Sequence, residues 1–404
     1  MSTAAFPPWP AFTEEEADRI REVLLSGRVN YWTGEEGRRF EEEFAGRVGA
    51  RHAIALANGT LALEVALRAL GIGPGDEVVV TPRSFVASAA CVVAVGARPV
   101  FADVDPDSQN LTAATIDAVR TARTRAVLCV HLAGLPCEMD PIRALADRHG
   151  LFVVEDCAQA HGARYRGRSV GTLGHVAAWS FCQDKIMTTG GEGGMVTTDD
   201  PALWRRAWSL KDHGKSWEAV HRDDHPPGFR WLHDAVGTNA RMTELQAAIG
   251  RIQTRRLTAW VEARRRNAAM LAEGLRGVPG LRVPEVPSHT AHAWYRFYAF
   301  LRPEHLAPGW SRERILQAVQ DRGVPCFSGS CPEIYLERAF ADRGLVPPAR
   351  LPVARALGET SLALLVHPGL EASHLSRTIE AVRAVLAEAV GRPPARVPSA
   401  GSSA

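Results

Sequence analysis

Lys185 is the residue whose position most strongly suggests covalent chemistry. It follows an apolar run, residues 175–181, that is typical of a buried strand, and a glycine-rich loop at residues 190–194 comes after it. A lone ammonium beside a core strand is costly to bury. One way to remove that cost is to use the amine as a nucleophile that forms a Schiff base with an aldehyde. Because a surface lysine would need no such explanation, the interpretation depends on the residues that accompany Lys185.

A carboxylate is predicted at the end of another interior strand. Asp156 ends the apolar run 151–156, and the carboxyl ends of parallel strands face the crevice in which open α/β sheets bind ligands. Pyridoxal phosphate (PLP), which is an aldehyde, needs an anion opposite its pyridine nitrogen, because the protonated ring stabilises the substrate carbanion. Asp156 could supply this anion. The alternative is that its side chain only caps the helix that starts near Ala158.

A phosphate site is predicted at Asn58-Gly59-Thr60. This tripeptide separates an apolar run, residues 53–56, from a helix-like segment, residues 61–70. A strand, a tight glycine turn and a hydroxyl group at a helix start describe an anion site, because the first-turn N–H groups and the helix dipole converge on a phosphate. The alternative is a plain Asn-Gly turn with Thr60 as the N-cap.

Together these features resemble the DegT/DnrJ/EryC1/StrS family of PLP-dependent sugar aminotransferases. The resemblance is nearly collinear from about residue 32 to residue 388. The segments that carry it are residues 31–34, 58–63, 73–78, 84–88, 96–105, 130–134, 155–163, 180–185, 191–194 and 239–248. Departures are few: Cys182-Gln183 stands where many members have His-Pro, and Gly190 is an additional glycine. Some relatives carry histidine in place of the lysine and perform dehydration, so Lys185 favours transamination.

The resemblance implies roles for the residues around the cofactor ring. Lys185 matches the lysine that forms the Schiff base with PLP, and Asp156 matches the partner of the pyridinium nitrogen. Phe85 matches an aromatic residue that stacks on the ring. Gln159 matches a glutamine that contacts the ring from the other side.

The resemblance also implies how the phosphate is held. Gly59, Thr60 and Ser180 match the phosphate cradle, to which Asn58 belongs as the first residue of the turn. Asn239 matches an asparagine that reaches the phosphate from the neighbouring subunit. A homodimer with shared active sites is therefore expected.

The activity implied by the resemblance is transfer of an amino group from glutamate or glutamine to a keto-sugar, most often a nucleotide-linked one. Three alternatives remain open. A sugar dehydratase, or an aminotransferase for an aminocyclitol ketone or a sugar aldehyde, would use the same scaffold. A regulatory or scaffold protein would keep PLP only as a structural ligand.

The polar stretch 211–232 is predicted to contact the substrate. It contains cationic and aromatic side chains, and long loops in compact domains are often lids or binding loops. Our hypothesis is that Lys215 and Arg230, together with Trp32, bind an anionic substrate, with the loop acting across the dimer interface. The alternative is a surface excursion without a role in binding.

The order of elements predicts an α/β fold. Predicted strands cover residues 53–56, 77–81, 98–103, 126–131, 151–155 and 294–301. Helical segments alternate with the first five, which requires a largely parallel sheet with helices on both faces. The resemblance implies the aspartate-aminotransferase-like fold type I with a smaller α+β C-terminal domain. The predicted divisions are an N-terminal arm (1–26), a large PLP-binding domain (27–251), a small domain (252–390) and a disordered tail (391–404).

Composition limits the remaining possibilities. A net charge of +2 with mixed signs gives no electrostatic case for a nucleic-acid partner. Seven scattered cysteines suit a reducing cytoplasm. The N-terminus lacks the features of a signal peptide, and the most apolar stretch, residues 85–97, falls short of the roughly 20 residues of a membrane span. We therefore expect a cytoplasmic protein without a membrane or nucleic-acid partner.

Two further clusters are interpreted as having no catalytic role. The histidines at positions 213, 221, 225 and 233 lack the spacing of a metal-ligand pair, so no metal site is predicted. Trp294, Tyr295 and Tyr298 are predicted to be core residues of the small domain.

Overall fold

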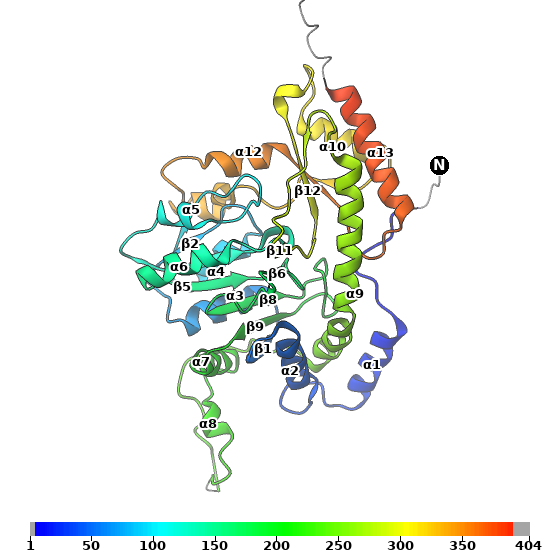
Figure 1. The fold of residues 1–404 in the computed structure, drawn as a ribbon. Helices are drawn as coiled ribbons and strands as arrows, with labels where there is room; N and C mark the ends of the chain where they lie inside the picture. Colours follow the sequence, from blue (N-terminus) through cyan, green and yellow to red (C-terminus); the bar gives the residue numbers. More distant parts are fainter. Residues whose placement is uncertain (1–4, 226, 391–404) are drawn as a thin grey trace, which may run out of the picture.

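The centre of the molecule is a seven-stranded sheet in the order β1-β9-β8-β5-β4-β2-β3 (Figure 1). The computed structural model describes residues 5–225 and 227–390. The strands are β1 (His52–Leu56), β2 (Glu77–Val80), β3 (Arg98–Phe101), β4 (Thr124–Val130), β5 (Phe152–Asp156), β8 (Val176–Ser180) and β9 (Gly194–Thr198). Neighbours from β3 to β8 run parallel, whereas β9 runs antiparallel to both β8 and β1. The predicted α/β fold with a largely parallel sheet is confirmed.

Helices cover both faces of this sheet because its strands are apolar on both sides. Val79 and Val127 belong to the apolar cluster of α2, α5 and α6, whereas Val78 and Leu128 belong to the cluster of α3, α4 and α7. This alternation follows the two-residue period of a strand. The covering helices are α2 (Glu36–Val48), α3 (Gly59–Ala69), α4 (Ala87–Ala94), α5 (Ala113–Asp117), α6 (Met139–His149) and α7 (Pro201–Lys211).

A helix of 32 residues, α9 (Glu244–Leu275), leads from the large sheet to a second, antiparallel sheet (Figure 1). The second sheet has the order β10-β12-β14-β13. Its strands and the helices that share its apolar cluster are β10 (Leu281–Arg282), β12 (Phe297–Leu301), β13 (Cys326–Phe327), β14 (Ser361–Leu364), α10 (Arg312–Gln320) and α13 (Ala372–Ala389). The boundary predicted after residue 251 lies inside α9, and the division into domains remains a prediction. The predicted tail at 391–404 lies outside the described residues.

The remaining elements are short apart from α1. They are the helices α1 (Glu14–Leu25), α8 (Trp217–Val220), α11 (Arg338–Ala341) and α12 (Pro352–Thr360), the 3-10 turns η1 (Leu132–Gly134), η2 (Pro303–His305) and η3 (Ile334–Leu336), and the small sheet of β6 (Arg164–Tyr165), β7 (Arg168–Ser169) and β11 (Thr290–Ala291). Among the described helices, none combines the length and apolarity that crossing a bilayer requires.

Most predicted boundaries shift by one to three residues, and two of these differences have a clear physical reason. Strand β12 begins at Phe297 and not at Trp294, because Trp294 has a φ of +54°, which is incompatible with extended backbone. Helix α3 begins at Gly59, and its N-cap is Asn58 rather than Thr60. The Oδ1 atom of Asn58 accepts a hydrogen bond from the N–H of Leu61 at 2.9 Å.

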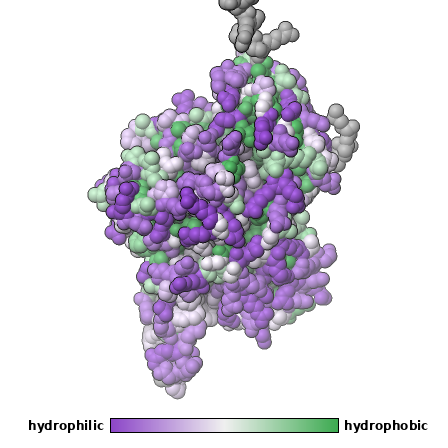
Figure 2. Space-filling model, viewed as in Figure 1, coloured by the Kyte–Doolittle hydropathy of each residue, from purple (hydrophilic) through white to green (hydrophobic). Residues whose placement is uncertain are grey.

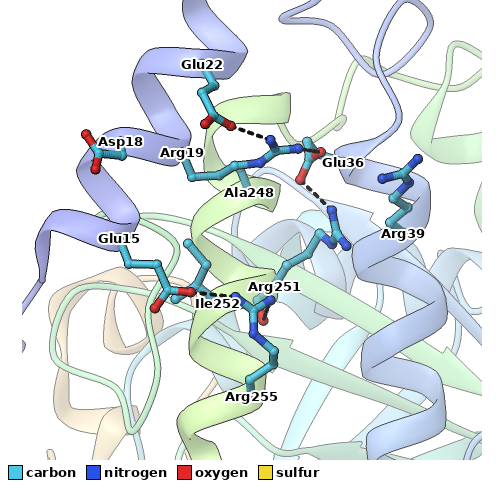
Figure 3. A pocket seen from close by; sticks show the side chains of 10 residues that line it. All are labelled: Glu15, Asp18, Arg19, Glu22, Glu36, Arg39, Ala248, Arg251, Ile252 and Arg255. Atoms are coloured by element: carbon cyan, nitrogen blue, oxygen red, sulfur yellow. Dashed lines mark hydrogen bonds and ion pairs between the residues drawn. The ribbon is translucent and has the colours of Figure 1, made fainter.

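Helix α1 packs on α9, and a hollow of about 440 Å³ lies at the surface between α1, α2 and α9 (Figure 3). Ion pairs join the helices around this hollow: Arg19 pairs with Glu36 at 2.5 Å, Arg251 with Glu36 at 2.9 Å, and Arg255 with Glu15 at 2.7 Å. Of these pairs, Arg255–Glu15 is exposed and contributes about 0–1 kcal/mol, whereas Glu36 is buried between two arginines. The hollow is therefore a charged surface at which ion pairs hold the N-terminal arm against α2 and α9.

The described part of the segment between α7 and α9, residues 212–225 and 227–243, projects from the body of the molecule around α8 (Figure 1). Its surface is mostly hydrophilic (Figure 2). Phe229 and Trp231 are exceptions: their side chains are largely exposed, and their ring centres lie 4.8 Å apart. We call these two described ranges, 212–225 and 227–243, the excursion.

Candidate active site

A cavity of about 660 Å³ opens at the carboxyl ends of β5 and β8 and at the N-terminus of α3. It is lined by Asn58, Gly59, Thr60, Leu61, Leu63, Ser84, Phe85, Ala87, Ser88, Val130, Asp156, Ala158, Gln159, Ala178, Trp179, Ser180, Cys182, Asp184, Lys185 and Glu192. The structure thus brings together eight of the predicted residues, from positions 58 to 185. Sites at this edge are expected because the strands of a parallel sheet end there together.

Lys185 lies in the turn that follows β8, and its side chain is 13% exposed. Its Nζ atom lies 3.4 Å from Oδ1 of Asp184 and 5.1 Å from the centre of the Tyr295 ring. The indole of Trp9, from the N-terminal arm, donates a hydrogen bond to the main-chain oxygen of Lys185 at 2.8 Å. The lysine is therefore held by segments that are distant in the sequence.

Asp156 is the last residue of β5 and is buried. Its Oδ2 atom accepts a hydrogen bond from the hydroxyl of Ser88 at 2.8 Å, and its Oδ1 atom accepts one from the N–H of Ala158 at 3.1 Å. Burial raises the pKa of Asp156, although these two donors and the nearby Lys185 favour the ionised form. No ion pair to this carboxylate is recorded among the described residues. A cationic group of a ligand in the cavity would supply the missing ion-pair partner of this carboxylate.

The turn before α3 packs closely on the end of β8 and lies at the wall of the cavity. A Cβ atom added at Gly59 would lie 2.6 Å from Cβ of Ser180, so a larger residue would collide with the end of β8. Asn58 turns its Oδ1 toward the helix and caps it. Thr60 is exposed in the first turn and lines the cavity. The N-terminus of an 11-residue helix therefore lies at the cavity, with the N–H of Leu61 already bound by Asn58.

Phe85 and Gln159 line the same cavity from two different segments. The Phe85 ring is 63% exposed and lines the cavity, so its face is accessible to a ligand. Gln159 is buried, and its Oε1 atom accepts a hydrogen bond from the N–H of Ala133 at 2.7 Å. This contact fixes the amide beside the cavity.

Four predicted residues do not line the cavity of their own chain. Asn239 is exposed and pairs through its backbone with Asp212 at the base of the excursion. Arg230 is exposed on the excursion. Lys215 and Trp32 lie together, with the Lys215 Nζ atom 4.2 Å from the centre of the Trp32 ring. Within one chain, these residues are not brought to Lys185.

Three residues around the site were not found from the sequence. Trp9 and Tyr295 lie 176 and 111 positions from their partners Lys185 and Asp184, and no local pattern reveals contacts over such separations. Ser88 lay inside a segment that carries the family resemblance, but its bond to Asp156 depends on how α4 meets β5. Tyr295 is buried, as predicted, yet its hydroxyl also donates to Asp184.

The charge of the cavity is uneven. Among the described residues that line it, Asp156, Asp184 and Glu192 are acidic, and Lys185 is the one cationic residue. An anionic ligand would therefore meet no arginine from the same chain. Cationic groups that bind such a ligand would have to come from residues outside this lining.

A cluster of His131, Glu155 and Cys157 lies behind Asp156, with possible ligand atoms within 4.8 Å of one another. Glu155 accepts hydrogen bonds from His131 and from three main-chain N–H groups, those of Gly171, Leu173 and Gly174. Both carboxylate oxygens are thus already used in buried contacts. The cluster is better described as a structural support of the loop after β5 than as a metal site.

Comparison with known proteins decides the family. The model of the DegT/DnrJ/EryC1/StrS aminotransferase family matches residues 10–383. The chain belongs to this family. As a family member it is an aminotransferase, and the resemblance proposed from the sequence is confirmed.

Relatives of the chain include curated enzymes and a solved structure. The chain is 40% identical to dTDP-3-amino-3,4,6-trideoxy-alpha-D-glucose transaminase of Streptomyces venezuelae over 365 residues, which is 90% of each protein. It is 38% identical to UDP-N-acetyl-3-dehydro-alpha-D-glucosamine 3-aminotransferase of Acidithiobacillus ferrooxidans, covering 91% of this chain and 95% of that one. The crystal structure of an aminotransferase from Psychrobacter cryohalolentis matches with a TM-score of 0.93 and 55% identity, covering 95% and 99% of the two chains.

Proposed function

We propose that this aminotransferase holds PLP on Lys185 and transfers an amino group from glutamate or glutamine to a nucleotide-linked keto-sugar. The observation that carries the proposal is the meeting of Lys185 with the buried carboxylate of Asp156 in one cavity, next to the N-terminus of α3. A nucleophilic amine, an anion and a helix N-terminus are the three groups that PLP requires.

The residues fit this cofactor. Asp156 is buried without a recorded ion pair among the described residues, and a pyridinium nitrogen would supply the missing charge. The N-terminus of α3, which packs closely on Ser180 at Gly59 and lies at the cavity, suits a phosphate. The exposed ring of Phe85 offers a face for stacking. When bound, PLP supplies the aldehyde carbon and a protonated ring that acts as an electron sink.

The chain's own residues then divide the work. The Nζ atom of Lys185 would act as a general base toward the proton on the donor's α-carbon, and then as a general acid that gives this proton to the former aldehyde carbon of the cofactor. Asp156 keeps positive charge on the ring nitrogen favourable throughout. Its hydrogen bonds from Ser88 and Ala158 fix the carboxylate for this task.

Several relatives support a sugar nucleotide as the amino acceptor. The two curated relatives named above carry dTDP-linked and UDP-linked sugars in their names. A second acceptor class also has support, because the chain is 39% identical over 328 residues to a putative L-glutamine:3-amino-2,3-dideoxy-scyllo-inosose aminotransferase of Streptoalloteichus tenebrarius. An aminocyclitol ketone would use the same cofactor residues.

A homodimer with shared sites would supply what one chain lacks. The cavity contains no arginine among its described lining residues, while Asn239, Lys215 and Arg230 lie on the excursion outside it. We infer that the excursion of one subunit brings Asn239 to the phosphate and Lys215 and Arg230 to the anionic substrate of its partner.

We further place the enzyme in the cytoplasm, because its seven cysteines, all within the described residues, are unpaired.

A titration of the cofactor spectrum tests the proposed function. The PLP-loaded protein should show an absorbance band that bleaches when glutamate or glutamine is added and returns when a keto-sugar nucleotide follows. The Lys185→Ala variant should lose this cycle. A band that persists in the presence of both donors would contradict transamination and indicate a scaffold that keeps PLP as a structural ligand.

A further inference from the structure

The carboxylate of Asp184 contacts both the amine of Lys185 and the hydroxyl of Tyr295, a buried residue 111 positions away in the sequence. Its Oδ1 atom lies 3.4 Å from the Lys185 Nζ atom, and its Oδ2 atom accepts a hydrogen bond from the hydroxyl of Tyr295. The Tyr295 ring also lies beneath the same amine, 5.1 Å from it. Tyr295 precedes β12 in the second sheet, so the contact joins the lysine turn to that sheet.

Tyr295 and Asp184 have the protonation states that a hydrogen bond from the phenol to the carboxylate requires. Burial raises the pKa of Tyr295 well above its usual value, so the phenol remains a hydrogen-bond donor. Burial also opposes ionisation of Asp184, but Lys185, the Tyr295 hydroxyl and Arg296 outweigh it and lower the pKa of this carboxyl. Asp184 is therefore an anion that is oriented by a neutral donor and lies beside the amine of Lys185.

Other charged groups also face this arrangement. Arg296 lies with its guanidinium carbon 4.9 Å from the centre of the Tyr295 ring. Asp156, the last residue of β5, and His161, from the segment that follows it, interact electrostatically with Lys185. Of the carboxylates, Asp184 is the one within ion-pair distance of the lysine amine in the described residues.

We propose that Asp184, oriented by Tyr295, is a positioning residue for the amine of Lys185. It holds this amine beside the cavity, and it stabilises the proton on Nζ after the lysine has acted as a base. No bond other than that to the proton changes in this step. The inference rests on the proposed function, in which Lys185 carries the cofactor.

The pH dependence of the cofactor spectrum tests this role without measuring turnover. The loaded wild-type protein should show an absorbance change with a defined midpoint pH. In Asp184→Asn the midpoint should move to lower pH by about one unit, because an anion within about 4–6 Å that favours the protonated form is lost. Tyr295→Phe should move it in the same direction by less, because the half-exposed carboxylate can then turn away.

The double variant separates positioning from general destabilisation. Since Tyr295 acts through Asp184, the variant with both changes should have the midpoint of Asp184→Asn alone. Tyr298→Phe is the matched control: Tyr298 is also buried, and its hydroxyl accepts a hydrogen bond from the N–H of Ser330 at 2.8 Å, away from the lysine. It should keep the wild-type midpoint.

Each remaining outcome overturns a distinct claim. A wild-type midpoint in Asp184→Asn, or additive shifts in the double variant, would overturn the positioning role. A wild-type protein that shows no cofactor band would overturn the proposed function, and this inference with it. If Asp184→Asn binds too little cofactor to be measured, Tyr295→Phe still tests the role, because it keeps the buried ring. A wild-type midpoint pH in Tyr295→Phe would also contradict the positioning role of Asp184.

Discussion

At the scale of single residues, the turn before α3 depends on the absence of a side chain at position 59. A Cβ atom at Gly59 would approach Ser180 Cβ to 2.6 Å, which no real pair of such atoms tolerates. We expect Gly59→Ala to push the first turn of α3 away from β8 and to weaken PLP binding on the order of tenfold or more, since about 1.4 kcal/mol suffices for each tenfold. Equilibrium dialysis of PLP measures this loss.

The matched control for that change is Gly46→Ala. Gly46 lies within α2, and nothing lies within 4 Å of an added Cβ atom there. Alanine should raise the stability slightly, by about 0.5–1 kcal/mol, and leave PLP affinity unchanged. Equal PLP affinities in Gly59→Ala and Gly46→Ala would argue against a phosphate cradle at Gly59.

Asp156 is the residue on which the electronic part of the proposal depends. Asp156→Asn keeps the size of the side chain and removes the charge that faces the ring nitrogen. We expect kcat to fall on the order of 10²-fold or more, by analogy with the loss of one preorganised electrostatic group. Steady-state kinetics check this, with the exposed Asp117→Asn as control. Normal activity in Asp156→Asn would refute the role of this carboxylate.

At the scale of elements, the base of the excursion is anchored to the body of its own chain. The buried Lys211 amine lies 3.5 Å from Oε1 of Glu41 and 3.8 Å from the centre of the Tyr31 ring. The main-chain N–H of Ala240 donates to the oxygen of Lys211 at 2.9 Å. These contacts bring both ends of the excursion together and fix Asn239 on the outside of the subunit, where a partner could use it.

Mixing two inactive variants tests whether active sites are shared. Lys185→Ala removes the amine, and Asn239→Ala removes the phosphate contact that we assign to the neighbouring subunit. In a mixed dimer one site carries both defects and the other carries neither. After subunit exchange of equal amounts, activity should recover to about a quarter of the wild-type value, because half of the dimers then hold one intact site. Activity that never exceeds that of the separate variants would contradict a shared site.

The elements of the site were more predictable than the contacts between them. Lys185, Asp156 and Gly59 each follow a short apolar run, and the carboxyl ends of parallel strands meet at one edge, so their meeting follows from local pattern and topology. Tyr295 and Trp9 could not be placed, because their contacts depend on how the second sheet and the N-terminal arm dock on the first. The start of β12 was misplaced because the positive φ of Trp294 has no sequence signal there.

At the scale of the whole molecule, buried neutral histidines link stability to pH. His161 is buried between the rings of Trp179 and Phe181, and neither ring nitrogen has a hydrogen-bond partner among the described residues. Burial, Lys185 and Arg264 lower its pKa to about 3. Below pH 6.5 the unfolded chain therefore binds a proton that the folded chain excludes, so this contribution to stability is present above pH 6.5 and is lost as the pH falls.

Replacing His161 with phenylalanine should remove that pH dependence and keep the packing. Between pH 7.5 and 5.5, the free energy of unfolding of the wild type should fall by about 1.4 kcal/mol more than that of His161→Phe. Urea denaturation at the two pH values measures the difference. The same pH dependence in both proteins would mean that His161 is not held neutral in the folded state.

The three parts of the molecule meet at the lysine. Lys185 lies in a turn of the large sheet. Tyr295, which precedes the second sheet's β12, donates a hydrogen bond to the neighbouring Asp184, and Trp9 of the N-terminal arm donates one to the main-chain oxygen of Lys185. The Trp9 ring also contacts Trp260 of α9 and stacks on His367, at 5.2 and 5.9 Å between ring centres. Docking of the arm and the second sheet is therefore coupled to the geometry of the amine.

Reduction of the PLP-loaded protein with borohydride, followed by peptide mass spectrometry, tests the central claim most directly. The sequence contains only three lysines, at positions 185, 211 and 215, so the site of attachment can be read without ambiguity. We predict a reduced pyridoxyl group on Lys185, with Lys211 and Lys215 unmodified. An unmodified Lys185, or a label on another amine in its place, would contradict the account.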